Sequence, residues 1–459
     1  MTADRAPNFA ARLAVAARRQ PEQAALVWNG GVLAWRELEA RAGGFARRLA
    51  REGVAPGDVV ALLLPNTPGF VAALWGGLAL GATVAPLNPL LAGDERRRIL
   101  AHLAPKAVID APPAGESRPL PTAADVTAPA IILYTSGSTG QPKGAVLSHA
   151  ALGAANESWA GPVMGLTETD RVLAALPLAH SFGLNGALLA PLLAGATVVL
   201  QERFSPEEAL HAIARHRVTV LPGVATMFSR ILESLALGET DGSSLRLAVS
   251  GAAPCPWPLA REWRQRTGVR IVRGYGMTEL FRPISYLAAE PADLPDAIGR
   301  AVPGVTLRLV DEELWIRTPA AMDGSLRAPE ETAAVLADGW FRTGDLATIS
   351  ADGFVSIVGR KRELILRGGY SVVPGEVEAA LLAHPAVAEA AVVGVAHAEL
   401  GEEVAAFVTL RPDARAAAEE LVAFCRERLA GYKYPRRITI VAELPKSATG
   451  KILKAKLKG

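Results

Sequence analysis

The chain has 459 residues, enough for about three structural units at roughly 150 residues per domain. It is 50% hydrophobic and 20% charged, and its 43 glycines and 33 prolines stay below the share found in low-complexity or collagen-like chains. The formal net charge of +2 excludes a strong overall attraction to nucleic acid. We therefore expect a globular protein with a large core and no nucleic-acid partner.

Two features of the sequence concern the compartment. The two cysteines, Cys255 and Cys425, lie far apart in the chain, which argues against a disulfide framework and favours the reducing cytoplasm. We expect both thiols to be packed and inert. Residues 1–20 contain no continuous apolar run, which excludes a secretory signal and favours a first amphipathic helix.

A stretch without charged side chains runs from residue 59 to residue 93, long enough to cross a bilayer. Prolines and asparagines divide it into short pieces, so we predict no integral membrane segment. Residues 59–64 are predicted as a buried strand, residues 69–80 as a buried helix, and residues 83–87 as a second strand. Continuous apolar strands are typical of a parallel sheet that is covered on both faces.

The same pattern returns further along the chain. Residues 172–200 repeat strand, apolar helix and strand, and both copies contain a Gly-Ala-Thr-Val turn, which begins at Gly81 and at Gly195. Residues 245–274 predict a third strand–helix–strand unit. These repeats indicate paired α/β subdomains.

After about residue 300 the pattern changes to short β-rich runs, and beyond residue 360 to a mixture of strands and helices. The predicted fold class is α/β. A large N-terminal domain, residues 1–361, would hold two α/β subdomains plus a β-rich subdomain, and a small mobile α+β C-terminal domain, residues 362–459, would follow. In that domain we expect strands at 386–395 and 402–410 and helices near 375–383 and 415–429.

The most informative motif is YTSGSTGQPKG, residues 134–144, which directly follows an apolar strand. Its small residues allow successive backbone N–H groups to face one anion, and Lys143 adds a positive charge, so the motif predicts a phosphate-binding loop. It is not a Walker A loop, because Lys143 precedes Gly144 and no metal-binding hydroxyl follows the lysine. A flexible linker fits poorly directly after a buried strand.

A second motif, GYGMTE, covers residues 274–279. It lacks the third glycine of a dinucleotide fingerprint, so its indication of a nicotinamide cofactor is weak. Thr278 offers a hydroxyl for a phosphate, and Glu279 offers a carboxylate for a hard cation such as Mg²⁺.

Three further segments carry candidate residues. Asp345 ends GWFRTGD and can accept hydrogen bonds from two ribose hydroxyls. The segment 359–370 combines cations with a Gly-Gly pair that allows close backbone approach. Lys451 stands in the turn-prone PKSATGK, where a lysine by itself is ordinarily a solvated surface charge.

Together these five ordered motifs resemble the AMP-forming adenylate family, which includes acyl- and aryl-CoA synthetases, carrier-protein adenylation domains and luciferase-type enzymes. The resemblance extends over nearly the whole chain, from residue 33 to residue 457. YKYP at residues 432–435 is more similar to CoA ligases than to peptide-synthetase adenylation domains. The family resemblance implies a ligase that joins a carboxylic acid to a thiol through an acyl-AMP, with ATP, Mg²⁺ and CoA.

The resemblance also implies roles for single residues. Glu279 would bind the metal, Lys451 would bridge the acid and the α-phosphate, and Thr278 and His180 would complete the catalytic set. Arg362 would be the hinge, where relatives usually have Asp or Lys. Gly368, Gly369 and Tyr370 would approach the thiol in the second half-reaction. ATP would be held by Thr135, Ser136, Gly137, Ser138, Thr139, Gly140, Lys143, Gly251, Ala252, Ala253, Gly274, Tyr275, Gly276, Thr278, Asp345 and Arg360.

The acid is less defined by the resemblance. Gly274 puts no side chain beside the expected acyl pocket, which favours a fatty or other hydrophobic acid over malonate, since malonyl-CoA synthetases tend to have Arg there. Against that, Arg282 could pair with a second carboxylate, or with a carboxylate of the protein itself. His180 belongs to PLAHSFG, which resembles the family's gate motif, and a structural histidine is the alternative there.

Other functions stay open from the sequence. An acyl-AMP ligase that loads an acyl carrier protein, or an aryl or dicarboxylic acid CoA ligase, is the alternative within enzymes. A degenerate nucleotide-binding protein is the alternative outside them, and the set Lys143, Glu279, Asp345, Arg360 and Lys451 argues against it. A dehydrogenase is the weakest candidate.

Overall fold

The computed structural model describes residues 8–111, 119–120, 125–136, 142–235, 241–290, 294–368, 370–446 and 452–457. The chain divides into two compact units. Unit 1 comprises residues 1–306 and 317–341, and unit 2 comprises residues 307–316 and 342–459. The predicted domain boundary after residue 361 stays a proposal.

The first sheet of unit 1 has the strand order β18-β7-β6-β4-β3-β5. The predicted strands at 59–64 and 83–87 are confirmed as β3 and β4, which pair in parallel. β6 and β7 form an antiparallel hairpin that carries the expected phosphate-binding motif. The strands are β3 (Val59–Leu62), β4 (Thr83–Pro86), β5 (Ala107–Ile109), β6 (Pro129–Ser136), β7 (Pro142–Ser148) and β18 (Gly324–Ser325).

The second sheet of unit 1 has the order β12-β11-β10-β8-β9-β1-β2. Its pairings are parallel from β12 to β1, as the repeated strand–helix–strand units predict. Four of its strands are buried along their whole length. The strands are β1 (Ala24–Trp28), β2 (Gly31–Ala34), β8 (Arg171–Ala174), β9 (Thr197–Leu200), β10 (Val220–Gly223), β11 (Leu247–Ser250) and β12 (Ile271–Val272).

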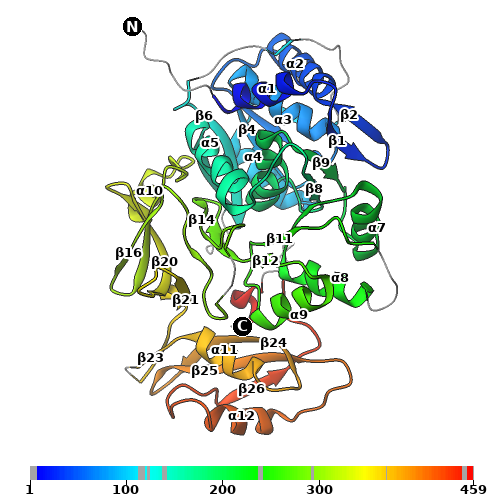
Figure 1. Ribbon diagram of the computed structural model, residues 1–459. Helices are drawn as coiled ribbons and strands as arrows, with labels where there is room; N and C mark the ends of the chain where they lie inside the picture. The colour runs from blue at the N-terminus through cyan, green and yellow to red at the C-terminus, as the bar shows by residue number, and fades with distance from the viewer. Residues whose placement is uncertain are drawn as a thin grey trace. The chain divides into compact units, whose positions relative to one another are not determined.

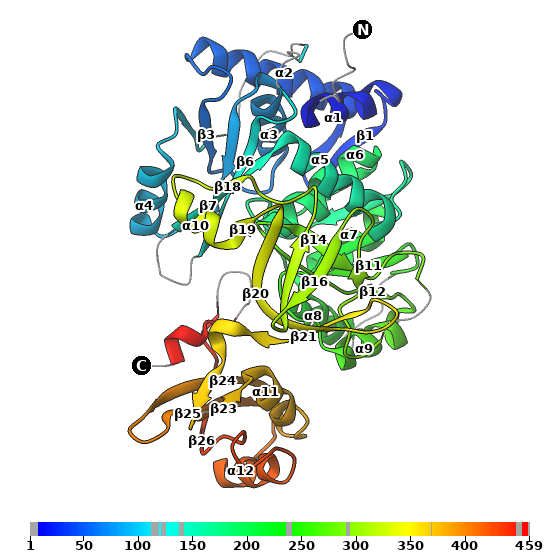
Figure 2. The same cartoon turned by 90° about the vertical axis from the view of Figure 1, so that its left-hand side faces the viewer.

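Helices cover these two sheets, and α1, α2 and α3 lie side by side (Figures 1 and 2). The stretch that is long enough to span a bilayer is confirmed as core, since α3 is buried nearly all round. Among the described residues, no helix is long and apolar enough to cross a membrane. The helices of unit 1 are α1 (Phe9–Arg19), α2 (Trp35–Arg51), α3 (Pro68–Leu80), α4 (Gly93–Leu103), α5 (His149–Ser158), α6 (Ala190–Ala194), α7 (Pro206–His216), α8 (Ala225–Leu235), α9 (Trp257–Thr267) and α10 (Pro329–Val335).

The shared Gly-Ala-Thr-Val turn has the same geometry in both copies. Gly81 ends α3 with φ 85°, and Gly195 ends α6 with φ 79°, both in the left-handed region where glycine avoids strain. The second copy differs in its helix. Residues Gly183–Leu189 form a π-helical segment before the short α6 begins.

A small antiparallel sheet completes unit 1 with the order β13-β14-β15. β13 (Gly274–Met277) and β14 (Phe281–Ser285) form the hairpin of the GYGMTE motif, and β15 (Arg300–Ala301) lies beside β14. The sequence pattern extended the strand before this motif to residue 274, whereas β12 ends at Val272 and Gly274 already belongs to the new sheet.

Unit 2 contains the β-rich strands and the C-terminal segment. β16 (Thr306–Val310), β17 (Glu313–Arg317), β20 (Trp340–Ile349) and β21 (Val355–Arg360) belong to one sheet, in which β19 (Leu336–Ala337) pairs with β20. The second sheet has the order β23-β22-β25-β24 with β26 beside β25. Its elements are β22 (Ile365–Arg367), β23 (Tyr370–Val372), α11 (Pro374–Leu382), β24 (Val387–His397), β25 (Gly401–Leu410), α12 (Ala418–Arg426) and β26 (Arg437–Ile440).

The core of unit 2 confirms the predicted α+β pattern. Val377 and Leu381 of α11 and Leu421 of α12 pack with alternate residues of β24 and β25 in one hydrophobic cluster. Cys425 is fully buried in this cluster, and burial raises the pKa of its thiol to about 11, so it is inert at neutral pH.

Candidate active site

The hairpin of β6 and β7 brings the two ends of the predicted phosphate-binding motif together. Tyr134 is the register partner of Gly144, and Thr135 of Lys143. The residues between the strand ends, Gly137, Ser138, Thr139 and Gly140 among them, lie outside the described residues. The motif therefore begins on β6 and ends on β7, and its two flanks lie side by side.

Two side chains outside the motif hold this hairpin. The hydroxyl of Tyr134 and Nδ1 of His102 on α4 share a hydrogen bond of 2.8 Å, and burial raises the pKa of Tyr134 to about 12. Nζ of Lys143 lies 2.7 Å from Oε2 of Glu331 on α10. Glu331 was not predicted from the sequence, because only the pairing of β18 with β7 brings the start of α10 to the motif.

The GYGMTE hairpin turns sharply at Thr278 and Glu279. A Cβ atom on Gly276 would lie 1.9 Å from the carbonyl oxygen of Phe281, so this strand position requires glycine. Phe281 itself has φ 57°, which re-aims β14 directly after the turn. Both Thr278 and Glu279 are partly exposed and are therefore accessible to a ligand.

One short segment connects this turn to the phosphate hairpin. The amide of Met322 donates to the carbonyl of Glu279 at 2.8 Å, and the amide of Asp323 donates to the carbonyl of Val146 on β7, also at 2.8 Å. The structure therefore brings the TE motif and the phosphate hairpin, about 140 residues apart in sequence, onto the same backbone segment.

The expected adenine segment follows β11 directly. Gly251, Ala252 and Ala253 lie in the turn after Ser250, and Ala252 has φ 63°. The carbonyl of Ser250 accepts a hydrogen bond of 2.7 Å from Arg282, which joins this turn to β14 of the GYGMTE hairpin. The two segments predicted to flank the nucleotide are thus neighbours.

The PLAHSFG segment is fixed by backbone contacts. The amide of His180 donates to the carbonyl of Pro177 at 3.0 Å, and a Cβ atom on Gly183 would lie 2.2 Å from that carbonyl oxygen. Burial lowers the pKa of His180, so its imidazole is neutral at physiological pH. Phe182 stacks on Trp159, with ring centroids 5.5 Å apart and planes 19° from parallel.

The buried amide of Asn66 anchors this segment to the first sheet. Its Nδ2 donates to the carbonyls of Leu176, at 2.8 Å, and Gln201, at 3.2 Å. Its Oδ1 accepts from the amide of Leu178 at 2.9 Å. A single side chain from the β3–α3 connection therefore ties the ends of β8 and β9 together.

In unit 2, the two residues predicted to hold the ribose are brought together. Asp345 on β20 and Arg360 on β21 are register partners, and Nε of Arg360 lies 2.8 Å from Oδ1 of Asp345. Asp345 is 2% exposed. Arg362 follows in the short 3₁₀ helix Lys361–Glu363. Its hinge role stays a prediction.

The predicted thiol-facing segment lies where β22 and β23 pair as antiparallel strands, with Arg367 opposite Tyr370. Gly368 has φ 56°, and Gly369 lies outside the described residues. Tyr370 is 56% exposed and stacks on Tyr432 with ring centroids 4.5 Å apart, a pair that the sequence did not reveal. Lys451 also lies outside the described residues, and Lys446 and Ile452 form an isolated antiparallel bridge.

The residues present fit a nucleotide-bound magnesium ion. Among the described residues, no group of three or more His, Cys, Asp or Glu side chains is arranged to hold a metal. Mg²⁺ in nucleotide enzymes is commonly bound by one or two carboxylates and by the substrate phosphates, so the single carboxylate of Glu279 suffices.

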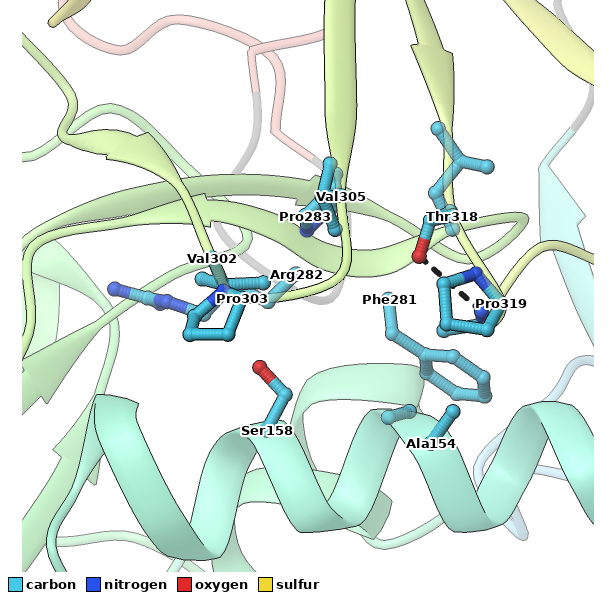
Figure 3. Close-up of a pocket in the computed structure, with 13 residues that line it drawn as sticks. Ala154, Ser158, Phe281, Arg282, Pro283, Val302, Pro303, Val305, Thr318 and Pro319 are labelled. Carbon is cyan, nitrogen blue, oxygen red and sulfur yellow. Dashed lines mark hydrogen bonds between the residues drawn. The ribbon is translucent and has the colours of Figure 1, made fainter. Parts of the chain in front are cut away.

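A detected cavity is too small to be the substrate site. It has a volume of about 20 Å³, room for one water molecule, between α5 and β14 (Figure 3). Ala154 and Ser158 of α5 and Phe281 and Arg282 of β14 contribute to its wall. An acid would have to bind elsewhere around these elements.

Comparisons with known proteins agree with this arrangement. The family described as "AMP-binding enzyme" matches residues 13–120 and 110–326, and "AMP-binding enzyme C-terminal domain" matches residues 376–451. A feruloyl-CoA synthase from Amycolatopsis is 36% identical, with 96% of each chain covered. A long-chain-fatty-acid–CoA ligase from Bacillus subtilis is 31% identical, with 96% of this chain and 92% of the relative covered.

The solved structures show the same relationship. ATP-bound MatB from Rhodopseudomonas palustris has a TM-score of 0.92 and 30% identity, with 98% of each chain covered. The chain belongs to the AMP-binding enzyme family. It is an AMP-forming acid–thiol ligase, an enzyme that uses ATP, Mg²⁺ and CoA.

Proposed function

We propose that this ligase activates a bulky acid with an apolar skeleton and transfers the acyl group to CoA. The observation that supports this most is the partly exposed ring of Phe182 in the PLAHSFG segment, which stacks on the buried ring of Trp159. A Cβ atom on Gly186 would lie 3.0 Å from both rings, and one on Gly251 would lie 3.1 Å from Phe182. These glycines let the rings pack closely and fix the orientation of Phe182, whose partly exposed ring can contact an apolar skeleton.

The relatives' names support the breadth of this proposal. Feruloyl and long-chain fatty acids are the acids named for the two relatives above, and both are bulky. The fatty-acid prediction from the sequence is therefore kept within a wider class of apolar skeletons. Neutral His180 lies two residues from Phe182, where it can contact the acid without adding charge.

In the first half-reaction, a carboxylate oxygen of the acid attacks the α-phosphorus of ATP, and the bond to pyrophosphate breaks. Lys143 and the backbone of the phosphate hairpin would neutralise the β- and γ-phosphates, and Thr278 would contact the α-phosphate. Glu279 would hold Mg²⁺, which supplies further neutralisation of the phosphate charge. Asp345 and Arg360 would hold the ribose, and Lys451 would contact both reactants.

In the second half-reaction, the CoA thiolate attacks the acyl carbon and AMP leaves. Gly368, which directly follows β22 with φ 56°, leaves its backbone uncovered, and this would suit the close approach of an extended thiol arm. A carrier-protein thiol would require a protein-docking surface in addition. CoA as acceptor therefore needs the fewest assumptions.

A panel of acids with pyrophosphate release as readout tests the first half-reaction. Aryl, aryl-propanoic and fatty acids from C6 to C16 should support ATP–pyrophosphate exchange better than acetate or malonate. Supplying free CoA or a phosphopantetheinyl carrier protein then separates the acceptors, and we expect thioester formation with CoA. Preference for acetate, or transfer to the carrier protein alone, would contradict the proposal.

A further inference from the structure

Arg282 is a buried cation beside the expected acyl pocket. It is the second residue of β14, three positions after Glu279, and it is 6% exposed. Figure 3 shows its side chain extending away from Phe281, which lines the opposite part of the small cavity. The guanidinium therefore lies inside unit 1 rather than at its surface.

Every hydrogen bond that the structure gives this guanidinium goes to an uncharged acceptor. Nε donates to Oγ of Ser285 at 2.9 Å, Nη1 to the carbonyl of Ser250 at 2.7 Å, and Nη2 to the carbonyl of Val272 at 3.2 Å. A guanidinium has five N–H groups, and these bonds use three of them. Within the described part of the chain, no carboxylate lies within salt-bridge distance of it.

This arrangement leaves a positive charge without a negative one in a dry environment. Burial lowers the pKa of Arg282 to about 9, and no neighbouring charge opposes that effect. A buried charge is costly unless it is paired, and an anion that enters beside it recovers part of that cost. Since no carboxylate among the described residues pairs with Arg282, the carboxylate of a ligand is a candidate partner for its charge.

The guanidinium occupies the place of a side chain at residue 274. A Cβ atom on Gly274 would lie 2.4 Å from Nη2, 2.5 Å from Cζ and 2.6 Å from Nε of Arg282. A Cβ atom on Gly251 would lie 3.3 Å from Nη1. Because Gly274 and Gly251 have no side chains, the guanidinium of Arg282 can lie in the space that a side chain at position 274 would fill.

Aromatic rings flank the same charge. Cζ of Arg282 lies 4.9 Å from the ring centroid of Trp159, which in turn stacks on Phe182. A planar cation over a ring is held in a fixed orientation and pre-arranged for bidentate binding of a carboxylate. Charge and apolar rings together suit an acid with an apolar skeleton and an anionic end.

We infer that Arg282 binds a second carboxylate of the acid, so that the substrate is a dicarboxylic acid with an apolar skeleton. This inference rests on the proposed function, since it places the acid beside Phe182 and Gly274. Arg282 is then a specificity-determining residue: its two remaining N–H groups would bind the carboxylate that does not react with ATP.

The test compares matched pairs of acids, each pair a dicarboxylic acid and the monoacid with methyl in place of the second carboxyl group. Terephthalate with 4-methylbenzoate, and hexadecanedioate with its chain-matched monoacid, cover aryl and alkyl skeletons. We expect kcat/KM for acyl-AMP formation to favour the dicarboxylic acid by at least about tenfold in one skeleton. Arg282→Met should abolish that preference.

Arg273→Met is a matched control. Arg273 is 5% exposed, and its guanidinium also donates to backbone carbonyls, those of Leu294 and Pro295. Trp257 and Tyr286 cover it, so no ligand approach is expected there. Its loss should lower thermal stability without changing the ratio of the two kcat/KM values.

Gly274→Ala provides a second variant, because its Cβ would displace the guanidinium while Arg282 stays in the chain. It should lower the same ratio, and thermal shift of the wild type by dicarboxylic acid gives a readout that needs no folded variant.

The outcomes separate the two proposals. If monoacids are activated but no dicarboxylic acid is preferred or bound, the Arg282 inference is wrong and the proposed function stands. If no acid of the panel supports exchange, the proposed function itself fails. If Arg282→Met changes only the KM for ATP, the guanidinium serves the nucleotide and the inference is overturned. If the variant lowers kcat/KM equally for the dicarboxylic acid and the monoacid, Arg282 has a structural role and the inference is also overturned.

Discussion

Lys143 of the phosphate hairpin forms an ion pair with Glu331 of α10, with Nζ and Oε2 2.7 Å apart. Both side chains are partly exposed, so the pair contributes little to folding. In the proposed mechanism the same ammonium group must contact ATP phosphates. Under that mechanism Glu331 would compete with the nucleotide for Lys143.

Replacing Glu331 should strengthen ATP binding. Exposed ion pairs contribute about 0.2–1 kcal/mol, so Glu331→Gln should lower the KM for ATP by no more than about fivefold. Steady-state kinetics at fixed acid measures this. Glu330→Gln, a change of an adjacent exposed carboxylate on the same helix, is the control and should leave the KM unchanged. An unchanged or higher KM in Glu331→Gln would show that no competition exists.

The two half-reactions should separate in variants of the C-terminal segment. Lys451→Ala should reduce acyl-AMP formation by at least about a hundredfold, as expected when a charge that stabilises the transition state is removed. Thioester formation from supplied acyl-AMP should be largely retained. Gly369→Trp should give the reverse pattern, because a bulky side chain would block the thiol path. Lys456→Ala, an exposed lysine nearby, controls for general loss of charge; equal losses in both steps would contradict the separation.

Acidification should destabilise the fold through His149. This residue is 2% exposed, neither of its ring nitrogens has a hydrogen-bond partner among the described residues, and burial lowers its pKa to about 4 from 6.5. Between these pH values the unfolded chain binds more protons, so the free energy of unfolding falls as pH drops from about 6.5 to about 4.

His149→Phe should show a smaller loss of stability between pH 7 and pH 5 than the wild type, by up to about 2 kcal/mol. Urea unfolding at both pH values measures the two losses, each relative to the same variant at pH 7. Part of the dependence of stability on pH should remain in His149→Phe, because the pKa values of His180 and His216 are also lowered. His211→Gln, on the exposed side of α7, is the control, and identical slopes in all three proteins would exclude the assigned role.

Loss of the Asn66 amide should affect both stability and the acid. Asn66→Ala leaves the Leu176 and Gln201 carbonyls and the Leu178 amide without their partner, at about 1–3 kcal/mol for each buried group. We expect a lower melting temperature and a higher KM for the acid, because PLAHSFG loses its anchor. Asn88→Ala removes only the side-chain bond to the Leu90 amide and should change neither. A loss of stability with an unchanged KM would show that the segment does not shape the acid site.

Much of the fold could be predicted because its strands are short, apolar and separated by turn residues. β3, β4, β8, β9 and β11 lie where the apolar runs place them. The π-helical segment after PLAHSFG could not, since an all-apolar run has no periodicity that distinguishes helix types. Its form is associated with the packing of Gly186 against Phe182 and Trp159, a tertiary contact.

The site was predicted in part for a similar reason. Asp345 and Arg360 are brought together as the motifs suggest. The direction of Arg282 was not predictable, because it depends on the left-handed conformation of Phe281 and on space left by a glycine eight residues earlier. Glu331 and Tyr432 reach their partners only through sheet pairing and chain folding.

The side chain of Arg282 on β14 fills the space that a side chain at position 274 on β13 would occupy. This affects how relatives should be compared. In a sequence alignment, position 274 would show a glycine, and the expected acyl pocket would then be taken as uncharged. The positive charge at this place comes from Arg282, which stands at a different position in the alignment. Substrate classes within such enzymes should therefore be compared by the atoms that fill a volume, with positions 274 and 282 considered together.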